Sequence, residues 1–306
     1  MPGTTTGVDV FGPDITGTSL STSFLDGIFG DGSDGDAVIV AGAPVTISRD
    51  TMYNNLTVPN GATLTPRGFR IFVKGTLTID AGGNINDNGK NAVGITAGGA
   101  LGSVTAGFGA GSGAGAAGRT TTGAGAASTT SSNCSINDLN QAPQGGNGGS
   151  AGGANTGGTA GAAPPPTIFQ KASSLAFMLS ARLYNGSSTM NGGSGGGAGG
   201  CDITGGAAAS GGGGGGAGIV WIACKTLVNN GSITCNGGAG ANGVSATGVA
   251  GGGGGGAGGM IALITATSTG IGTVTANGGT AGTSVGTGST APTAAKIGNV
   301  GVIILS

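Results

Sequence analysis

The sequence predicts an all-β protein of parallel β-solenoid-like repeats, in which long Gly-rich segments pack as polyglycine II helices. Three observations support this fold class. Six glycines occur in a row twice, at 211–216 and 251–256, and the two runs begin 40 residues apart. Each run leads through Ala-Gly into an apolar, largely β-branched stretch, at 219–223 and 260–264. A fixed period of this size is typical of repeat architectures.

A short unit ending in Asn-Gly recurs along the sequence. Its apolar residues alternate with polar ones, which predicts strands with one buried face, and Asn-Gly suits the tight corner that follows. We expect the units to stack, with Met190, Cys235 and Ala276 in one interior column. The stretch 175–183 also fits an amphipathic helix, but its position before the same Asn-Gly favours a strand. The units are 75–89, 182–193, 226–238 and 270–279.

Residues 45–89 show the same pattern more densely. Short apolar strands are separated by corners such as Pro59-Asn60-Gly61 and Gly82-Gly83. Such spacing suits the coils of a parallel β-solenoid, in which each coil depends on its neighbours for a core. The expected strands are 45–47, 56–58, 62–64, 71–73 and 77–79, with a further one at Ile85.

The Gly-rich connections at 193–218 and 238–260 are too long for turns. They fit flexible coil or polyglycine II, an extended threefold helix whose N–H and C=O groups must bond to neighbouring chains. We expect the two Gly hexads to be ordered neighbours in register. Residues 92–166, rich in Gly, Ala, Ser and Thr, predict a less regular lobe.

The distribution of charge divides the protein. Charged residues make up only 7%, and there is no His or Glu. Residues 1–36 carry six Asp and no Lys or Arg, whereas no acid follows Asp202. We expect an acidic attachment segment at 1–36, solenoid coils at 37–91, an irregular lobe at 92–170 and the glycine repeats at 171–306.

Four cysteines, Cys134, Cys201, Cys224 and Cys235, form no CxxC pair, and no His is present to complete a zinc site. They are interpreted as small buried apolar residues, with a Cys224–Cys235 disulfide as the alternative. The formal charge of −1 argues against nucleic-acid binding, which needs clustered Lys and Arg.

Catalysis and ion binding find little support in the residues. The segment Asp31–Asp36 resembles a calcium loop, but Gly42 stands where the twelfth-position acid of an EF-hand belongs. The Gly runs lack the Gly-Lys-Ser/Thr of a phosphate loop. The scarcity of acids and the absence of His disfavour an enzyme. No catalytic residue, metal ligand or cofactor is predicted.

The segments 29–36, 53–58, 68–73 and 75–77 resemble the opening of Gly-rich tail-fibre or appendage proteins of tailed bacteriophages. The later Gly runs are similar to the polyglycine-sandwich adhesins at the fibre tips of such phages. The resemblance implies a virion structural or host-attachment protein without a cofactor. In those adhesins, loops between the Gly strings contact the receptor.

The expected role is a rigid projection that docks to other virion proteins through residues 1–36 and forms a homo-oligomer. A host-surface glycan or protein is the expected outer partner. Neither a signal peptide nor a membrane-spanning stretch is found, so we expect synthesis in the host cytoplasm and a place in the virion. The alternative function is a Thr-bearing lattice binder, of the ice-binding kind, or an extracellular structural protein. The expected partner-binding anchors are Phe11, Ile15, Leu20, Phe24, Leu25, Ile28 and Phe29.

Overall fold

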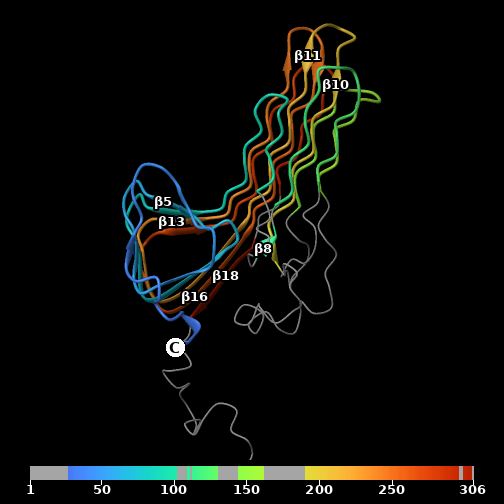
Figure 1. Ribbon diagram of the computed structural model, residues 1–306. Helices are drawn as coiled ribbons and strands as arrows, with labels where there is room; N and C mark the ends of the chain where they lie inside the picture. Colours follow the sequence, from blue (N-terminus) through green and yellow to red (C-terminus); the bar gives the residue numbers. More distant parts are fainter. Residues whose placement is uncertain are drawn as a thin grey trace, which may run out of the picture.

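The computed structural model describes residues 27–101, 109–110, 112–129, 144–161, 190–295 and 299–304. Within these ranges the protein is nearly all β, and only Gly27 and Ile28 have helical conformation. The all-β prediction is confirmed. Two parts are visible in Figure 1: a ring of strands and, projecting from it, a bundle of extended segments. We call them the strand stack and the glycine bundle.

Two parallel sheets form the strand stack. In the larger sheet the order is β1-β4-β6-β12-β16-β18, and β3 also pairs with β6; in the smaller the order is β17-β13-β7-β5-β2. The larger sheet contains β1 (Ala37–Val38), β3 (Thr51–Tyr53), β4 (Leu56–Val58), β6 (Arg70–Ile79), β12 (Ile219–Asn229), β16 (Met260–Thr269) and β18 (Asn299–Ile304). The smaller contains β2 (Val45–Thr46), β5 (Thr63–Thr65), β7 (Asn84–Asn86), β13 (Ser232–Thr234) and β17 (Thr273–Thr275).

The main apolar core lies between the two sheets. Leu77 of β6 and Leu227 of β12 pair in register, and Ile85 and Ile233 pair across the smaller sheet. All four side chains are buried in one cluster. The strands expected between residues 45 and 89 are therefore confirmed, except that 71–73 and 77–79 belong to one continuous strand, β6.

A second apolar cluster covers the other face of the larger sheet. Trp221 and Met260 belong to it, together with Phe29. It explains why 219–224 and 260–264 are apolar without alternation, since strands buried on both faces need no polar side. Farther along, residues 226–229 of β12 alternate between partly buried and buried positions because only one face is fully covered there.

Neighbouring strands of the stack are far apart in the sequence. β7 ends at residue 86 and β12 begins at 219, yet Ile71 of β6 pairs with Ile222 of β12. The described parts of 87–218 leave the stack as extended strings and return to it. Two later excursions, at 235–259 and 276–295, separate β13 from β16 and β17 from β18. These strings make up the glycine bundle.

The bundle is held by backbone hydrogen bonds that repeat every third residue. Gly211, Gly214 and Ala217 donate to residues of the string 251–257, each at 2.9 Å. The string 211–218 donates to three neighbours and accepts from three others, so six strings surround it. It donates to 87–94, 113–116 and 251–257, and it accepts from 98, 193–199 and 238–241; at its end, Gly218 also accepts the N–H of Met260. The two Gly hexads are thus ordered neighbours in register, as the repeat predicts.

Close approach of backbones explains why this interior is glycine. A Cβ added at Gly214 would overlap the carbonyl oxygen of Gly238, and one at Gly213 would overlap that of Gly196. Residues 211–218 are all buried. A side chain larger than hydrogen therefore has no room at Gly213 or Gly214, whereas a methyl group fits at the buried Ala217.

Asn side chains close the flank of the bundle. The Oδ1 atom of Asn88 accepts the N–H of Asn236 at 2.7 Å, and Oδ1 of Asn236 accepts the N–H of Asn277 at 2.7 Å. Asn242 does the same for Thr283 at 2.9 Å. At this flank the side-chain oxygen of Asn accepts the backbone N–H that the carbonyl of another string would otherwise accept. The N–H groups at the flank are therefore hydrogen-bonded, and the surface there is polar.

Three expectations require correction. Met190 lies in β9 (Met190–Asn191), which pairs with β8 (Gly109–Ala110) and not with the smaller sheet; only Cys235 and Ala276 share the interior position, beside Asp87. No Cys224–Cys235 disulfide forms, because both thiols are free and buried. The segments 112–129 and 144–161, expected in an irregular lobe, are strings of the bundle. Cys134 and 175–183 lie outside the described residues.

Candidate functional site: the distal end of the glycine bundle

Within the described residues, five loops meet at the end of the bundle farthest from the strand stack. Each joins an outgoing string to a returning one, and we call them the distal loops. They lie beyond or beside the short strands β10 (Cys201–Asp202), β11 (Ala208–Ala209), β14 (Val244–Ser245) and β15 (Val249–Ala250), two of which mark this end in Figure 1. The loops are 120–122, 151–154, 203–207, 244–248 and 286–289.

Hydrogen bonds and strand pairs hold the distal loops together. The Ile203 N–H donates to Oγ1 of Thr122 at 3.1 Å, and the Ala246 N–H donates to the carbonyl of Ala207 at 3.1 Å. β10 pairs with β15, and β11 pairs with β14, both antiparallel. Ser150 and Thr290 share a 2.8 Å hydroxyl contact at the base of two further loops. The loops therefore form one surface on a fixed base.

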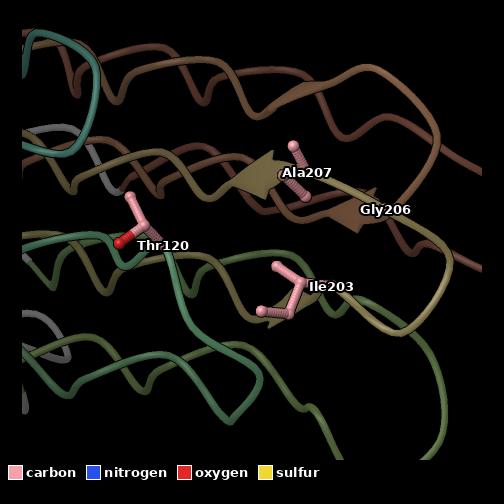
Figure 2. A pocket seen from close by; sticks show the side chains of 5 residues that line it. Thr120, Ile203, Gly206 and Ala207 are labelled. Carbon is pink, nitrogen blue, oxygen red and sulfur yellow. The ribbon is translucent and has the colours of Figure 1, made fainter.

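A shallow open hollow lies on this surface (Figure 2). Thr120 borders it from one loop, and Ile203, Gly206, Ala207 and Ala208 border it from the next. The side chains are small, and Ile203 is 40% exposed. The hollow offers one hydroxyl and a few apolar groups, which suits contact with a surface better than enclosure of a small molecule.

The distal loops carry little charge. Asp202 accepts hydrogen bonds from the N–H and hydroxyl of Thr204, at 2.9 and 2.6 Å, and the hydroxyl bond holds its pKa below the ordinary value. Arg119 lies at the base of the first loop. Exposed Thr and small apolar side chains dominate, including Val244, which is 64% exposed. Across the described ranges, no three His, Cys, Asp or Glu side chains gather as metal ligands.

A second surface is the outer face of the smaller sheet, which we call the polar face. Thr63 and Thr65 of β5 point outward, and the strands beside them repeat this pattern in register. Side chains two residues apart share one face of a strand, and neighbouring strands lie about 4.8 Å apart, so the face is a regular uncharged ladder. Its residues are Thr46, Thr63, Thr65, Asn84, Asn86, Ser232, Thr234, Thr273 and Thr275, of which Thr234 has a buried hydroxyl.

Two of the expected partner anchors lie within the described residues. Phe29 is 1% exposed and packs against Ile219, Trp221 and Met260, and Ile28 packs against the same cluster. Phe29 is therefore engaged by the protein's own strands. The remaining anchors lie outside the described residues: Phe11, Ile15, Leu20, Phe24 and Leu25. A partner-binding role for these side chains stays a prediction.

The end of the expected acidic attachment segment joins the strand stack. Asp34 accepts hydrogen bonds from Arg49 and from the N–H of Met52, and the Arg49 bond holds its pKa below the ordinary value. Asp36 accepts hydrogen bonds from the side chains of Asn54 and Asn55, at 2.8 and 2.9 Å. These carboxylates fasten residues 31–36 to the next coil of the stack, which gives them a structural role.

One carboxyl group is buried at the junction of the stack and the bundle. Asp87 is 4% exposed, and its Oδ2 accepts the N–H of Ile219 at 3.0 Å. Burial raises its pKa to about 7. The equivalent residues in the neighbouring coils are Cys235 and Ala276, so Asp87 places an ionisable group in an otherwise apolar column.

Comparisons with known proteins give no relative: no family model, curated protein or solved structure matches the sequence. Within the described ranges, no helix has the length and apolarity needed to cross a membrane.

Sequence reasoning did not locate the distal loops as one surface. A signal was present, because short stretches with Thr, Ser, Asp, Ile or Val interrupt the Gly strings at 120–122, 201–207 and 244–249. If each interruption is interpreted as a turn between two strings, the turns are expected to lie together at one end of the bundle.

Proposed function

We propose that this protein is a virion structural protein of a tailed bacteriophage, a fibre, appendage or tip protein whose distal loops contact the host surface. In this proposal the strand stack is a β-solenoid, and the glycine bundle is a polyglycine II lattice. The supporting observation is the buried string 211–218, which bonds to its neighbours at every residue while five loops share the far end.

The arrangement suits a passive projecting scaffold. A bundle whose inner string 211–218 is hydrogen-bonded along its whole length gives the loops a rigid base, and a rigid base lowers the entropy lost on binding. The loops are neutral and small, so they suit a host-surface glycan or protein better than a strongly charged partner. Docking to other virion proteins through residues 1–36 and homo-oligomerisation remain part of this proposal.

Competition for adsorption tests the loops. Purified protein should slow phage adsorption to host cells, and the double variant Ile203→Asp/Val244→Asp should compete much less well. Val38→Asp/Val40→Asp is the matched control, because Val38 and Val40 are exposed in and just after β1 of the strand stack, far from the distal loops. Equal competition by both variants would remove the distal loops from the proposal.

A truncation tests attachment. The cut belongs at residue 26, because removing residues 27–36 would also remove Phe29 and the bonds of Asp34 and Asp36. Protein lacking residues 1–26 should keep its circular dichroism spectrum and be missing from purified particles, as judged by immunogold labelling. Labelled particles would assign attachment to another part of the protein.

A second candidate function rests on the polar face. An uncharged ladder of Thr, Ser and Asn side chains at even spacing suits an extended lattice such as ice. Thermal hysteresis of the purified protein tests this function, with Thr65→Lys/Thr273→Lys as the variant that breaks the ladder. Thermal hysteresis that the variant abolishes would favour lattice binding. If the wild-type protein shows no hysteresis, this second candidate function is contradicted and the virion proposal is the one that stays.

A further inference from the structure

Three Asn-Gly pairs occupy equivalent positions where strands of the smaller sheet pass into the glycine bundle. They are Asn88-Gly89, Asn236-Gly237 and Asn277-Gly278. In the first two, the amide after the Asn is bonded: Gly89 donates to the carbonyl of Asn236, and Gly237 donates to that of Asn277, each at 2.8 Å. The side-chain Oδ1 of each of these two Asn residues also accepts a backbone N–H.

The third pair stands at the edge of this row and differs in each respect. Asn277 is exposed, whereas Asn88 and Asn236 are partly buried. Within the described residues, the Gly278 N–H finds no acceptor, and the Asn277 side chain makes no hydrogen bond. The same local sequence, Asn-Gly-Gly, therefore meets two environments, at 236–238 and 277–279.

We propose that Asn277 is a site of spontaneous deamidation, protected at the two equivalent positions by the fold. The backbone nitrogen of Gly278 attacks Cγ of Asn277 and loses its proton, and a new bond forms between these two atoms. The bond from Cγ to Nδ2 breaks and ammonia leaves, which gives a succinimide. Water then opens the ring at either carbonyl and leaves aspartate or isoaspartate, so the only co-reactant is water.

The reaction needs a nitrogen that is free to attack and a side chain that is free to turn. At Asn236 both groups are held by hydrogen bonds, so the string must open locally before the ring can close. Among the described residues, no hydrogen bond holds either the Gly278 nitrogen or the Asn277 side chain. Glycine as the following residue adds no side chain to block the approach, and all three pairs share this feature.

The isoaspartate product would loosen the outer string. It inserts one extra carbon into the backbone, immediately before residues that bond in steps of three. Gly279, Gly282 and Val285 donate to the carbonyls of Gly256, Gly253 and Ala250. A longer backbone shifts these donors out of register, so the string 278–285 should detach from the bundle as the protein ages.

One tryptic peptide contains both the site and its controls. Cleavage after Lys225 and Lys296 releases 226–296, which contains Asn236, Asn242 and Asn277. The folded full-length protein is incubated at mildly alkaline pH, digested and sequenced by tandem mass spectrometry. Deamidation at Asn277 should be at least about fivefold faster than at Asn236, the ratio expected from one hydrogen bond of about 1 kcal/mol.

A parallel incubation in urea separates fold from sequence. Since both sites read Asn-Gly-Gly, their rates should become equal once the protein is unfolded. Equal rates in the folded protein, or a ratio that survives in urea, would overturn the proposal. After ageing, the amides of Gly279 and Gly282 should exchange their hydrogen faster than in fresh protein. The variant Asn277→Ser should prevent this change. Aged wild-type protein that exchanges like fresh protein would contradict the detachment of the string.

Discussion

The strand stack and the glycine bundle satisfy their backbone hydrogen bonds in opposite ways. In the stack, strands bond edge to edge within two sheets, and side chains such as Ile71, Leu77 and Ile85 fill the space between the sheets. In the bundle, strings bond in several directions, and the buried positions carry no side chain or only a small one, such as that of Ala198 or Ser194. The stack gains stability from apolar burial, whereas the bundle depends on backbone bonds that need close approach.

The comparison teaches that the two parts should fail in opposite ways. A cavity should damage the stack, since its core depends on packed volume. An added methyl group should damage the bundle, since its interior depends on the lack of volume. A pair of substitutions, one in each part, separates the two kinds of stability.

The largest effect is expected in the bundle. Gly214→Val should destabilise the protein by about 3 kcal/mol or more, because the new side chain overlaps the carbonyl of Gly238 and the string cannot move without breaking its bonds. Urea denaturation measures the loss. Gly99→Val is the control, because Gly99 is exposed and a Cβ there meets only the flexible end of Lys90. Similar losses for both variants would contradict the close-approach explanation.

The next effect belongs to the stack. Leu77→Ala should cost roughly 2–4 kcal/mol, because Leu77 is fully buried between the sheets and its removal leaves a cavity. The same denaturation experiment measures it. Thr78→Ala, one residue on and facing outward, should cost much less. A stack that tolerates Leu77→Ala as well as Thr78→Ala would not rely on packed volume.

A smaller, pH-dependent effect is expected at the junction of the two parts. Burial raises the pKa of Asp87 from 3.8 to about 7, so the folded state binds a proton more tightly than the unfolded state. The free energy of unfolding should therefore fall as the pH rises from about 4 to about 7, and level off above that. Asp87→Asn keeps the acceptor for Ile219 and should flatten this dependence. An unchanged slope in the variant would assign the dependence to other groups.

The smallest effect is expected at the flank of the bundle. Asn242→Ala removes the acceptor of the Thr283 N–H and should cost about 1 kcal/mol, since the freed group is exposed and water replaces part of the bond. Amide exchange at Thr283 should accelerate, while exchange at Gly214 in the interior should not change. Equal acceleration at both amides would mean that the flank and the interior open together.

Much of the stack was predictable from the sequence, because alternation and Asn-Gly corners report a local conformation. The strands at 56–58, 84–86, 232–234 and 273–275 follow this pattern. The neighbour of each strand was harder to predict. β6 lies beside β12 across 139 intervening residues, from 80 to 218, and no local pattern encodes that pairing.

The bundle was predictable in part. The equal phase of the two Gly hexads placed them side by side, but the strings within 112–161 mix Ala, Ser and Thr with Gly and looked irregular. In the structure, Ala124, Ala127, Thr156 and Thr159 lie toward the outside, on strings whose inner residues still bond to the bundle. The distal loops were missed for the same reason, because they become one surface only after the strings are paired.

The repeat of three in the bundle has a consequence for how this gene can change. Adding one codon to a string rotates every later residue to a different neighbour and brings side chains into the glycine interior. Adding three codons restores each residue to its former neighbour. If matched triplets are added to both strings of a hairpin, the loop moves outward by roughly 9 Å on the proposed polyglycine II geometry. Heritable insertions can therefore lengthen the bundle, and move a distal loop outward, in steps of three residues per string while the glycine interior stays unchanged.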